Sequence, residues 1–445
     1  MNQSQSPKYK ARRPFDTSRY EVADEKLETF YGLPQQVKFC KKCVYSNQYP
    51  ASAVEVRHTK ESKKTTLNIN DDGVCDACRV NELKQKEINW KAREEQLVEL
   101  CNKHRSKDGS YDCIVPGSGG KDSVYAAHVL KHKYGMHPLT VTWAPHIYTE
   151  WGWKNFQAWI HSGFDNFLYT PNGKVHRLLT RLAVENLFHP FQPFIIGQKA
   201  YAPKMALLHK IPLVFFGENE AEYGNPIKGF DSAKRDWSYF TSQDKSQVHF
   251  GGTSFEDLTK SFGLSEHDLQ PYMPANPEEI QKNKVEVHYL GYYIKWHPQG
   301  AYYYAVQNCG FNPAPERSPG SHTKYVSIDD RIDDFHYYTT YIKFGIGRTT
   351  YETAAEIWNE EVNRDEAVAL VKRFDGEYPE RFSDEIFKYL SIPQQEFPEA
   401  SATFEQPVMD RDYFMSLADQ FRSPHLWKRE NGVWKLRHAV WHENS

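Results

Sequence analysis

The middle of the chain alternates between short apolar runs and stretches in which apolar residues recur every three or four positions. Short apolar runs bounded by turn residues are typical of buried strands, and a spacing of three or four indicates one face of a helix. The pattern predicts strands at 111–115, 139–143, 166–169 and 211–216. It predicts helices at 122–134, 153–161, 174–187 and 199–209. Strands that alternate with helices favour an α/β fold with a doubly wound parallel sheet.

The flanking regions have other patterns, which divide the chain into four parts. Residues 1–35 form a polar leader that we expect to be loosely ordered. Residues 36–105 hold paired cysteines and a charged, helix-prone stretch at 82–104. Residues 106–230 make up the predicted α/β core, and residues 231–445 are predicted to form a mostly helical, substrate-binding region.

Composition narrows the class of protein. The 445 residues carry a formal net charge of −3, which argues against nucleic-acid binding driven by charge. The first residues lack the apolar core of a secretory signal, and no apolar run approaches the length that crosses a bilayer. We therefore expect a soluble, cytoplasmic protein that binds neither membrane nor nucleic acid. The 28 Tyr, 26 Phe and 11 Trp suit sugars and bases, although such rings also fill ordinary cores.

The segment VPGSGGKDS joins the first predicted strand to the first predicted helix. Glycines let a backbone approach a phosphate closely, and the N-terminus of the following helix offers unpaired N–H groups. The segment differs from the GxxxxGK[ST] loop because Asp122 stands in place of Ser or Thr, and it lacks the GxGxxG spacing of dinucleotide sites. We predict a polyphosphate site for ATP in which Lys121 and Asp122 are catalytic. The predicted ATP-binding residues are Ser118, Gly119, Gly120, Lys121, Asp122, Ser123 and Gly217.

Acidic and amide side chains follow the strand predicted at 211–216, in the sequence FFGENEAEYGN. The carboxyl ends of parallel strands lie at the edge of the sheet where ligands bind. Oxygen ligands of this kind suit Mg²⁺. Asp122, Glu218, Asn219 and Glu222 are therefore predicted to hold Mg²⁺ or substrate, and a solvated acidic turn is the alternative.

Four of the seven cysteines form two C-x-x-C pairs. Four thiolates at this spacing are typical of a structural, tetrahedral Zn²⁺ site with no open coordination position. We predict that Cys40, Cys43, Cys75 and Cys78 bind structural Zn²⁺. An iron–sulfur cluster, a redox pair and free thiols are the alternatives.

The form SGGKDS resembles the PP-loop of the N-type ATP pyrophosphatases, which include GMP synthetase, asparagine synthetase and tRNA thiolation enzymes. The resemblance implies a HUP-like fold in which the loop holds the β- and γ-phosphates while the α-phosphate is attacked. ATP is then split to pyrophosphate and an adenylated substrate, with Mg²⁺ as the cofactor.

Six segments are similar to a narrower family, the N-acetyl sugar amidotransferases of surface polysaccharide and nonulosonic acid biosynthesis. They are CKKCVYSN, DDGVCDAC, VPGSGGKDS, FFGENEAEYGN, YYIKWHPQGAYYYA and KFGIGRTTYETAAEIWNEEVNRDEAVALVKRFDG, within about residues 36–380. The resemblance implies an ATP-dependent carbon–nitrogen ligase that adenylates the acetamido oxygen of a nucleotide-linked N-acetyl sugar. Ammonia then replaces that oxygen, which gives an acetamidino sugar for lipopolysaccharide (LPS), O-antigen, capsule or flagellin glycans.

The resemblance also implies a sugar site and a partner. The residues expected to contact the sugar are Tyr223, Lys295, Trp296, Lys343 and Arg348. Each of them also fits an ordinary surface or core position. Met1-Asn2 offers no cysteine nucleophile, and the lone cysteines lie in no G-x-C-x-G context. We therefore expect ammonia to come from a separate glutaminase subunit that resembles the histidine-biosynthesis amidotransferase.

Two other functions stay open at this point. A four-cysteine site beside a PP-loop also occurs in tRNA thiolation enzymes, and a sulfur transfer of that kind would depend on Cys309. A non-catalytic module with a vestigial nucleotide site is the second alternative. The patterns do not choose among UDP-linked, CMP-linked and free sugars, and they leave the oligomeric state undetermined.

Overall fold

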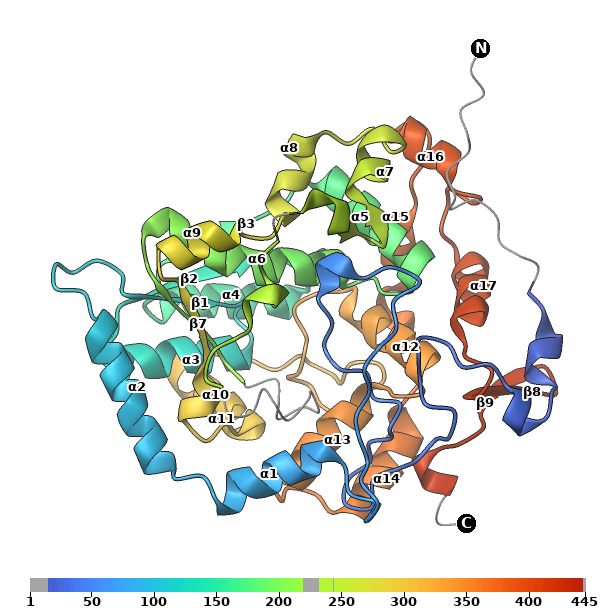
Figure 1. The fold of residues 1–445 in the computed structure, drawn as a ribbon, viewed down its shortest axis with the longest axis horizontal. Helices are drawn as coiled ribbons and strands as arrows, with labels where there is room; N and C mark the ends of the chain where they lie inside the picture. Colours follow the sequence, from blue (N-terminus) through green and yellow to red (C-terminus); the bar gives the residue numbers. More distant parts are fainter. Residues whose placement is uncertain (1–14, 219–231, 243, 443–445) are drawn as a thin grey trace.

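The computed structural model describes residues 15–218, 232–242 and 244–442. Its centre is a parallel five-stranded sheet with the order β3-β2-β1-β4-β7 (Figure 1). The strands are β1 (Cys113–Pro116), β2 (Pro138–Trp143), β3 (Asn166–Tyr169), β4 (Leu213–Phe216) and β7 (Glu286–Tyr289). The predicted α/β class with a parallel sheet is confirmed.

The strand order places the glycine segment at a reversal in the path of the chain. After β1 the chain adds β2 and then β3 on one side, and it later returns to add β4 on the other side of β1. At such a reversal the connections that leave the two central strands diverge, and a crevice opens beyond their carboxyl ends. The glycine segment follows β1, and the predicted acidic turn follows β4.

Helices cover both faces of the sheet. Its strands therefore have nearly continuous apolar sequences instead of an alternation of apolar and polar residues. In β1, Cys113 and Val115 pack into one core with α3, α4 and α11, while Ile114 faces the opposite side and packs with α6. The helices around the sheet are α2 (Trp90–His104), α3 (Lys121–His132), α4 (Glu150–His161), α5 (Gly173–Leu187), α6 (Gln192–His209), α9 (Pro277–Lys282) and α11 (Pro298–Cys309).

The predicted elements of the core agree with the observed ones except at two places. Helix α6 begins at Gln192 rather than at residue 199, since Pro193 fits the first turn of a helix. Strand β7 lies beyond the predicted end of the core at residue 230, so the sheet extends past that boundary. Its sequence, EVHY, is too short and too mixed in polarity to be separated from its surroundings by pattern alone.

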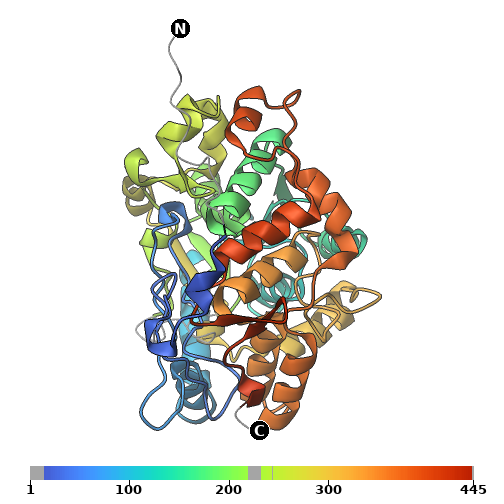
Figure 2. The same cartoon turned by 90° about the vertical axis from the view of Figure 1, so that its right-hand side faces the viewer.

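The start of the described chain packs against its end (Figure 2). Tyr20 and Leu33 lie in one apolar cluster with Trp427 and Leu436. The last two belong to a hairpin of β8 (Trp427–Glu430) and β9 (Val433–Leu436). Residues 15–35 thus differ from the loose order expected of them, because burying these rings offsets the entropy of ordering the segment.

The chain beyond the sheet is mostly helical, as predicted. Figure 1 shows α12, α13 and α14 beside the cysteine-bearing segment. The remaining elements are α1 (Asp76–Lys86), α7 (Phe255–Lys260), α8 (Glu266–Leu269), α10 (Leu290–Tyr293), α12 (Asp333–Phe344), α13 (Arg348–Trp358), α14 (Arg364–Phe374), α15 (Ser383–Leu390), α16 (Pro398–Thr403), α17 (Arg411–Phe421), β5 (His249–Phe250) and β6 (Thr253–Ser254). Among the described residues, no helix combines the length and the apolar character that crossing a membrane requires.

Candidate functional site

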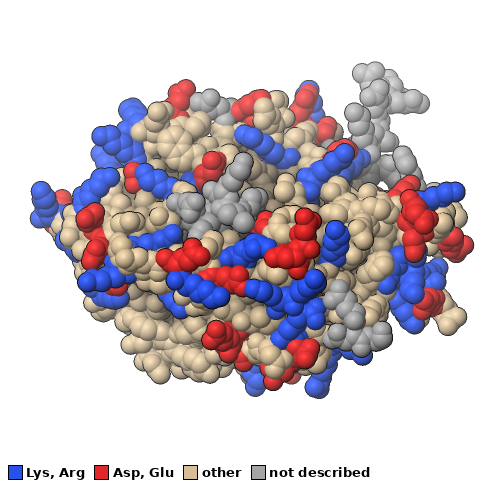
Figure 3. All heavy atoms as spheres, turned by 60° about the horizontal axis from the view of Figure 1, so that its bottom comes forward, with Lys and Arg blue, Asp and Glu red and all other residues tan. Residues whose placement is uncertain are grey.

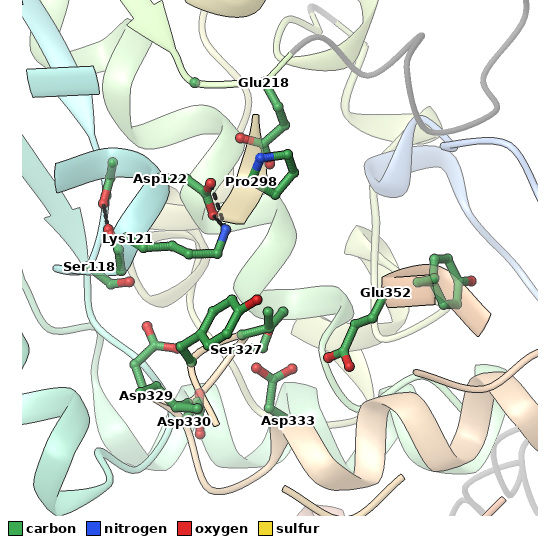
Figure 4. A pocket seen from close by; sticks show the side chains of 18 of the residues that line it. Ser118, Lys121, Asp122, Glu218, Pro298, Ser327, Asp329, Asp330, Asp333 and Glu352 are labelled. Carbon is green, nitrogen blue, oxygen red and sulfur yellow. Dashed lines mark hydrogen bonds and ion pairs between the residues drawn. The ribbon is translucent and has the colours of Figure 1, made fainter. Parts of the chain in front are cut away.

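A cavity of about 620 Å³ opens at the carboxyl ends of β1 and β4. It is lined by the glycine loop 116–123, by the segment that leads into α12, and by side chains of α6, α12 and α13. Figure 4 shows Lys121 on one side of this cavity, with Asp329 and Asp333 on another. The cavity therefore occupies the crevice that the strand order predicts.

Two glycines have different functions in the loop. Gly119 has a φ of +88°, and a Cβ there would lie 2.6 Å from the backbone Cα of Phe156 in α4. Only glycine fits this left-handed, closely packed position. Gly120 faces open space, since a Cβ there would meet nothing within 4 Å. Gly119 thus fixes the path of the loop, and Gly120 leaves room for a ligand at the N-terminus of α3.

The two charged residues of the loop pair with each other. Lys121 Nζ donates to both carboxylate oxygens of Asp122, at 2.7 and 2.6 Å. Ser123 Oγ donates to the carbonyl of Gly120 at 3.0 Å, which closes the first turn of α3. The loop therefore holds a Lys–Asp ion pair at the wall of the cavity.

Carboxylates from a distant part of the chain face the loop. Burial raises the pKa of Asp329, and a hydrogen bond with Ser118 of the loop opposes that shift. Burial raises the pKa of Asp333 well above its usual value, against the opposing effect of Arg348. Asp330, also in the cavity lining, accepts hydrogen bonds from the backbone N–H and Nδ1 of His146, at 2.6 and 2.8 Å. Asp330 therefore ties this segment to the loop that follows β2, while Asp329 and Asp333 face the cavity.

Arg348 ties the first turn of α13 to the cavity wall and is only 1% exposed. Its Nε donates to Glu352 Oε1 at 3.2 Å, and its Nη2 donates to the carbonyls of Val326 and Ser327. Glu352 also accepts a hydrogen bond from Ser321 Oγ at 2.6 Å. The guanidinium thus holds a buried carboxylate in place beside the cavity.

A side chain from beyond α14 caps the N-terminus of α13. Asp375 accepts from the backbone N–H of Gly347 at 3.0 Å and from the backbone N–H and Oγ1 of Thr350 at 3.2 and 2.5 Å. These bonds satisfy donors that a helix leaves free at its start. Burial raises the pKa of Asp375 to about 6. The placement of Arg348 therefore depends on α14 as well as on its own helix.

The structure brings the predicted ATP-binding residues together. The loop residues 118–123, Gly217 and Glu218 all line the cavity. A Cβ at Gly217 would lie 2.9 Å from the ring of Trp296, which explains why glycine stands there. Asn219, Glu222 and Tyr223 lie outside the described residues.

Three of the predicted sugar contacts lie elsewhere. Trp296 is fully buried and packs edge-on against Tyr125 at 5.2 Å, so it offers no face for stacking. Lys343 is buried and donates to the carbonyl of Leu187 at 2.8 Å. Lys295 is exposed and lies outside the lining of the cavity. Trp296 and Lys343 thus lie outside the cavity lining, and their burial does not favour the expected sugar contacts, because residue type does not reveal depth. Arg348 is the one of the four described candidates that lines the cavity.

The sequence patterns did not identify the carboxylates on the cavity wall opposite the glycine loop, which we call the facing wall. Asp329, Asp333 and Glu352 lie more than 200 residues after the loop, and the structure brings them to the same cavity. The dense acidic run SIDDRIDDF was the available signal. Such runs are usually solvated surface, so composition alone did not separate it from the others.

The four paired cysteines form a second, separate site. Their sulfur atoms are buried and all lie within 4.8 Å of one another. Cys40 and Cys78 have an Sγ–Sγ distance of 3.8 Å, and Cys43 and Cys75 one of 3.7 Å. Zn–S bonds of about 2.3 Å in a tetrahedron give edges of about 3.8 Å, so the sulfur atoms fit a bound metal ion of this kind.

Hydrogen bonds to the sulfur atoms support the same interpretation. The backbone N–H of Cys75 donates to Cys40 Sγ at 3.3 Å, and that of Cys78 donates to Cys75 Sγ at 3.4 Å. The indole N–H of Trp358 in α13 donates to Cys78 Sγ at 3.2 Å. Donors of this kind stabilise thiolates and orient metal ligands. The described part of the chain therefore contains a four-cysteine cluster that is suited to a metal ion.

Comparison with known proteins adds a family match for one part of the chain. Residues 319–440 match the family described as LPS biosynthesis protein WbpG-like, C-terminal domain. Over 84 residues the chain is 34% identical to an uncharacterized protein of Methanocaldococcus jannaschii, a match that covers 19% of this chain and 29% of that relative. The NMN synthetase of Francisella tularensis is a structural neighbour with a TM-score of 0.24 and 14% identity, covering 44% of this chain and 94% of that one. That score is too low to add to the topology described above.

Proposed function

We propose that this protein is an ATP-dependent amidotransferase that converts the acetamido group of an N-acetyl sugar to an acetamidino group during LPS or related surface-glycan biosynthesis. One observation carries the proposal. Asp329, Asp333, Arg348 and Glu352, which belong to the segment that matches the LPS biosynthesis family, line the same cavity as the SGGKDS loop. The proposed phosphate-binding loop and the segment that matches the LPS biosynthesis family thus line one cavity.

The chemistry requires activation of a poor electrophile. An amide oxygen does not leave as oxide, and transfer of AMP to that oxygen turns it into a good leaving group. In this proposal the loop N–H groups at the start of α3, with the hydroxyls of Ser118 and Ser123, hold the departing pyrophosphate, and their position in the cavity lining supports this role. Lys121 neutralises charge on the phosphates once it leaves Asp122.

Metal ions have two proposed places. Mg²⁺, held by Asp122 and Glu218 at the mouth of the loop, would screen the phosphate charge and leave the α-phosphate open to attack. Zn²⁺ in the four-cysteine cluster would be structural, since four thiolates leave no open position for chemistry.

The facing wall is suited to the hydroxyl groups of a pyranose. Asp333 and Glu352 present carboxylate oxygens, which accept hydrogen bonds from hydroxyls. The nucleotide part of a UDP- or CMP-linked sugar would lie outside this wall.

Ammonia is proposed to come from a separate glutaminase subunit, and the reaction to take place in the cytoplasm. A glutaminase needs a reactive thiolate, and the described chain holds its three unpaired cysteines in buried positions. Burial raises the pKa of Cys309 to about 11, which keeps this thiol protonated at neutral pH.

The burial of Cys309 also argues against the alternative function, tRNA thiolation. A sulfur relay requires an accessible, ionised cysteine, and burial of Cys309 disfavours this. RNA binding requires a continuous basic surface. On the face drawn in Figure 3, Lys and Arg side chains are interspersed with Asp and Glu, so this face lacks a continuous basic patch. The amidotransferase is therefore the function that we propose.

The test uses the purified full chain with ATP, Mg²⁺, ammonium and a panel of nucleotide-linked N-acetyl sugars. AMP release and product mass are followed together. We expect AMP and a sugar product lighter by the difference between O and NH. Lys121→Met should lower AMP formation by about 100-fold or more, while Lys131→Met, on the same helix, should leave it unchanged.

Two results would contradict the proposal. AMP formation without a change in any sugar would assign the activity to another acceptor, with tRNA to be tried next. Absence of AMP with every sugar, also in the presence of a glutaminase, would overturn ATP-dependent catalysis itself.

A further inference from the structure

Glu361 lies on the wall of the cavity, in the turn that joins α13 to α14. Its backbone N–H donates to the carbonyl of Glu356 at 2.9 Å, which closes the turn after α13. Its side chain is 16% exposed, so the carboxylate is largely shielded from bulk water. The sequence did not indicate a functional role for Glu361, because the surrounding stretch NEEVNRDE is typical of a charged surface turn.

Four charged or titratable groups of the described chain lie near Glu361. Tyr325, on the cavity wall, is one of them, since the charge of Glu361 helps to raise its pKa. Glu356, on α13, and Lys121, in the glycine loop, interact with its charge. His297, which caps α11, places Nε2 3.5 Å from Glu361 Oε1. Among the described residues, Oε1 of Glu361 has no hydrogen-bond partner. Because Oε1 is shielded from solvent, the exposed part of this side chain belongs to its other atoms, at the wall of the cavity.

His297 lies beside this carboxylate at the edge of the cavity. Its Nδ1 accepts the backbone N–H of Gly300 at 2.8 Å, so the proton of the neutral ring lies on Nε2, toward Glu361. The imidazole is 42% exposed. The Nε2–H of the neutral ring thus points toward the Glu361 carboxylate, and a proton taken up by Glu361 would leave through the cavity rather than through His297.

The carboxyl group is also tuned for proton transfer near neutral pH. Burial raises the pKa of Glu361 to about 7, the charge of Glu356 adds to this, and Lys121 opposes it. A base whose pKa lies near the working pH is the most effective. The link to Lys121 places this group close to the loop at which the adenylated substrate would form.

We propose that Glu361 is the general base that takes a proton from the attacking nitrogen in the amidination step. This inference rests on the proposed function. Ammonia bonds through its lone pair to the carbon of the adenylated, protonated imidate, and the nitrogen becomes positively charged. That nitrogen gives one proton to the Glu361 carboxylate. The C–O bond then breaks, its electron pair leaves with AMP, and an amidinium cation remains.

The cysteine-bearing segment holds Glu361 in place from both sides. Three residues before it, Trp358 donates to Cys78 Sγ at 3.2 Å. Three residues after it, Arg364 donates to the carbonyls of Cys43 and Cys40 at 3.2 Å each. The turn is therefore fixed at both ends to the cysteine segment, which gives a structural metal ion a direct effect on the position of this base.

The experiment separates adenylation from nitrogen transfer. Sugar-dependent exchange of labelled pyrophosphate into ATP, without ammonium, reports the first step, and product mass with ammonium reports the second. We expect Glu361→Gln to keep the exchange and to lose product formation by about 100-fold or more at pH 7. Glu360→Gln, on the same turn but exposed, is the matched control.

The dependence of product formation on pH distinguishes a general base from a residue with only a structural role. Glu361 must be ionised to accept the proton, so product formation by the wild type should rise as the pH passes through about 7. Glu361→Gln should lack this inflection, and Glu361→Asp should recover part of the rate.

Three results decide the matter. An equal loss of exchange and product in Glu361→Gln would assign the residue to ATP binding and overturn the proposal. Unchanged product formation with the same pH profile would also overturn it. No exchange and no product from the wild type with any sugar would instead overturn the proposed function, and this inference with it.

Discussion

The indole N–H of Trp358 in α13 donates to Cys78 Sγ across 280 residues of sequence, at 3.2 Å. The contact joins the four-cysteine cluster to the helix that carries Arg348 and Glu352. A cluster that looks like an independent metal module in the sequence therefore supports one wall of the candidate active site.

This relationship predicts that Trp358 influences metal affinity. Trp358→Phe keeps the ring but removes the donor, and hydrogen bonds of this kind typically change metal affinity by about 10–100-fold when lost. We expect that much weaker Zn²⁺ retention in competition with a chelator. Trp153→Phe, an exposed tryptophan on α4, should retain the metal as the wild type does. Equal retention by both variants would show that the indole N–H does not tune the cluster.

The two adjacent glycines of the loop should respond differently to alanine. Gly119→Ala forces a left-handed φ and a contact with the backbone of Phe156, so we expect a loss of about 1–3 kcal/mol in the free energy of unfolding. Gly120→Ala projects into open space and should leave stability unchanged while weakening ATP binding. Denaturant unfolding and nucleotide titration check the pair, and a reversed order would refute the assigned functions of the two glycines.

Substitution of Arg348 should lower the stability of the folded protein more than it changes sugar binding. Arg348→Met leaves the buried carboxylate of Glu352 without its cation, while Asp334 keeps Arg381 at 2.9 Å. Breaking a buried pair in this way costs about 3–5 kcal/mol. Arg373→Met, on the exposed side of α14, is the control and should be neutral. A stable Arg348→Met variant whose KM for the sugar alone rises would instead favour direct substrate contact.

Lys343 should make stability depend on pH above neutrality. Burial lowers the pKa of Lys343 to about 7 in the folded chain, against an unfolded value of about 10.4. The unfolded chain therefore binds more protons between these values, and stability rises with pH in that window, by at most about 1.4 kcal/mol per unit. The stability difference between wild type and Lys343→Met should grow in favour of the wild type from pH 7 to 10. A constant difference would show that Lys343 titrates normally.

The sequence by itself determined the local features. Apolar runs and helical spacing set the strands β1 to β4 and helices α3 to α6, because each element buries its own apolar positions. The SGGKDS loop and the C-x-x-C pairs were likewise readable, since each motif contains its chemistry within a few residues.

Only the tertiary structure decided which distant residues share a site. Strand β7 joined the sheet through backbone pairing that side-chain pattern does not encode, and Trp296 and Lys343 proved to be buried because depth depends on the elements packed above them. The facing carboxylates Asp329, Asp333 and Glu352, and the base proposed at Glu361, reach the loop only through packing of α12 and α13. Long-range packing determines which carboxyl groups are buried. Burial shifts their pKa values and distinguishes them from carboxylates on the solvated surface.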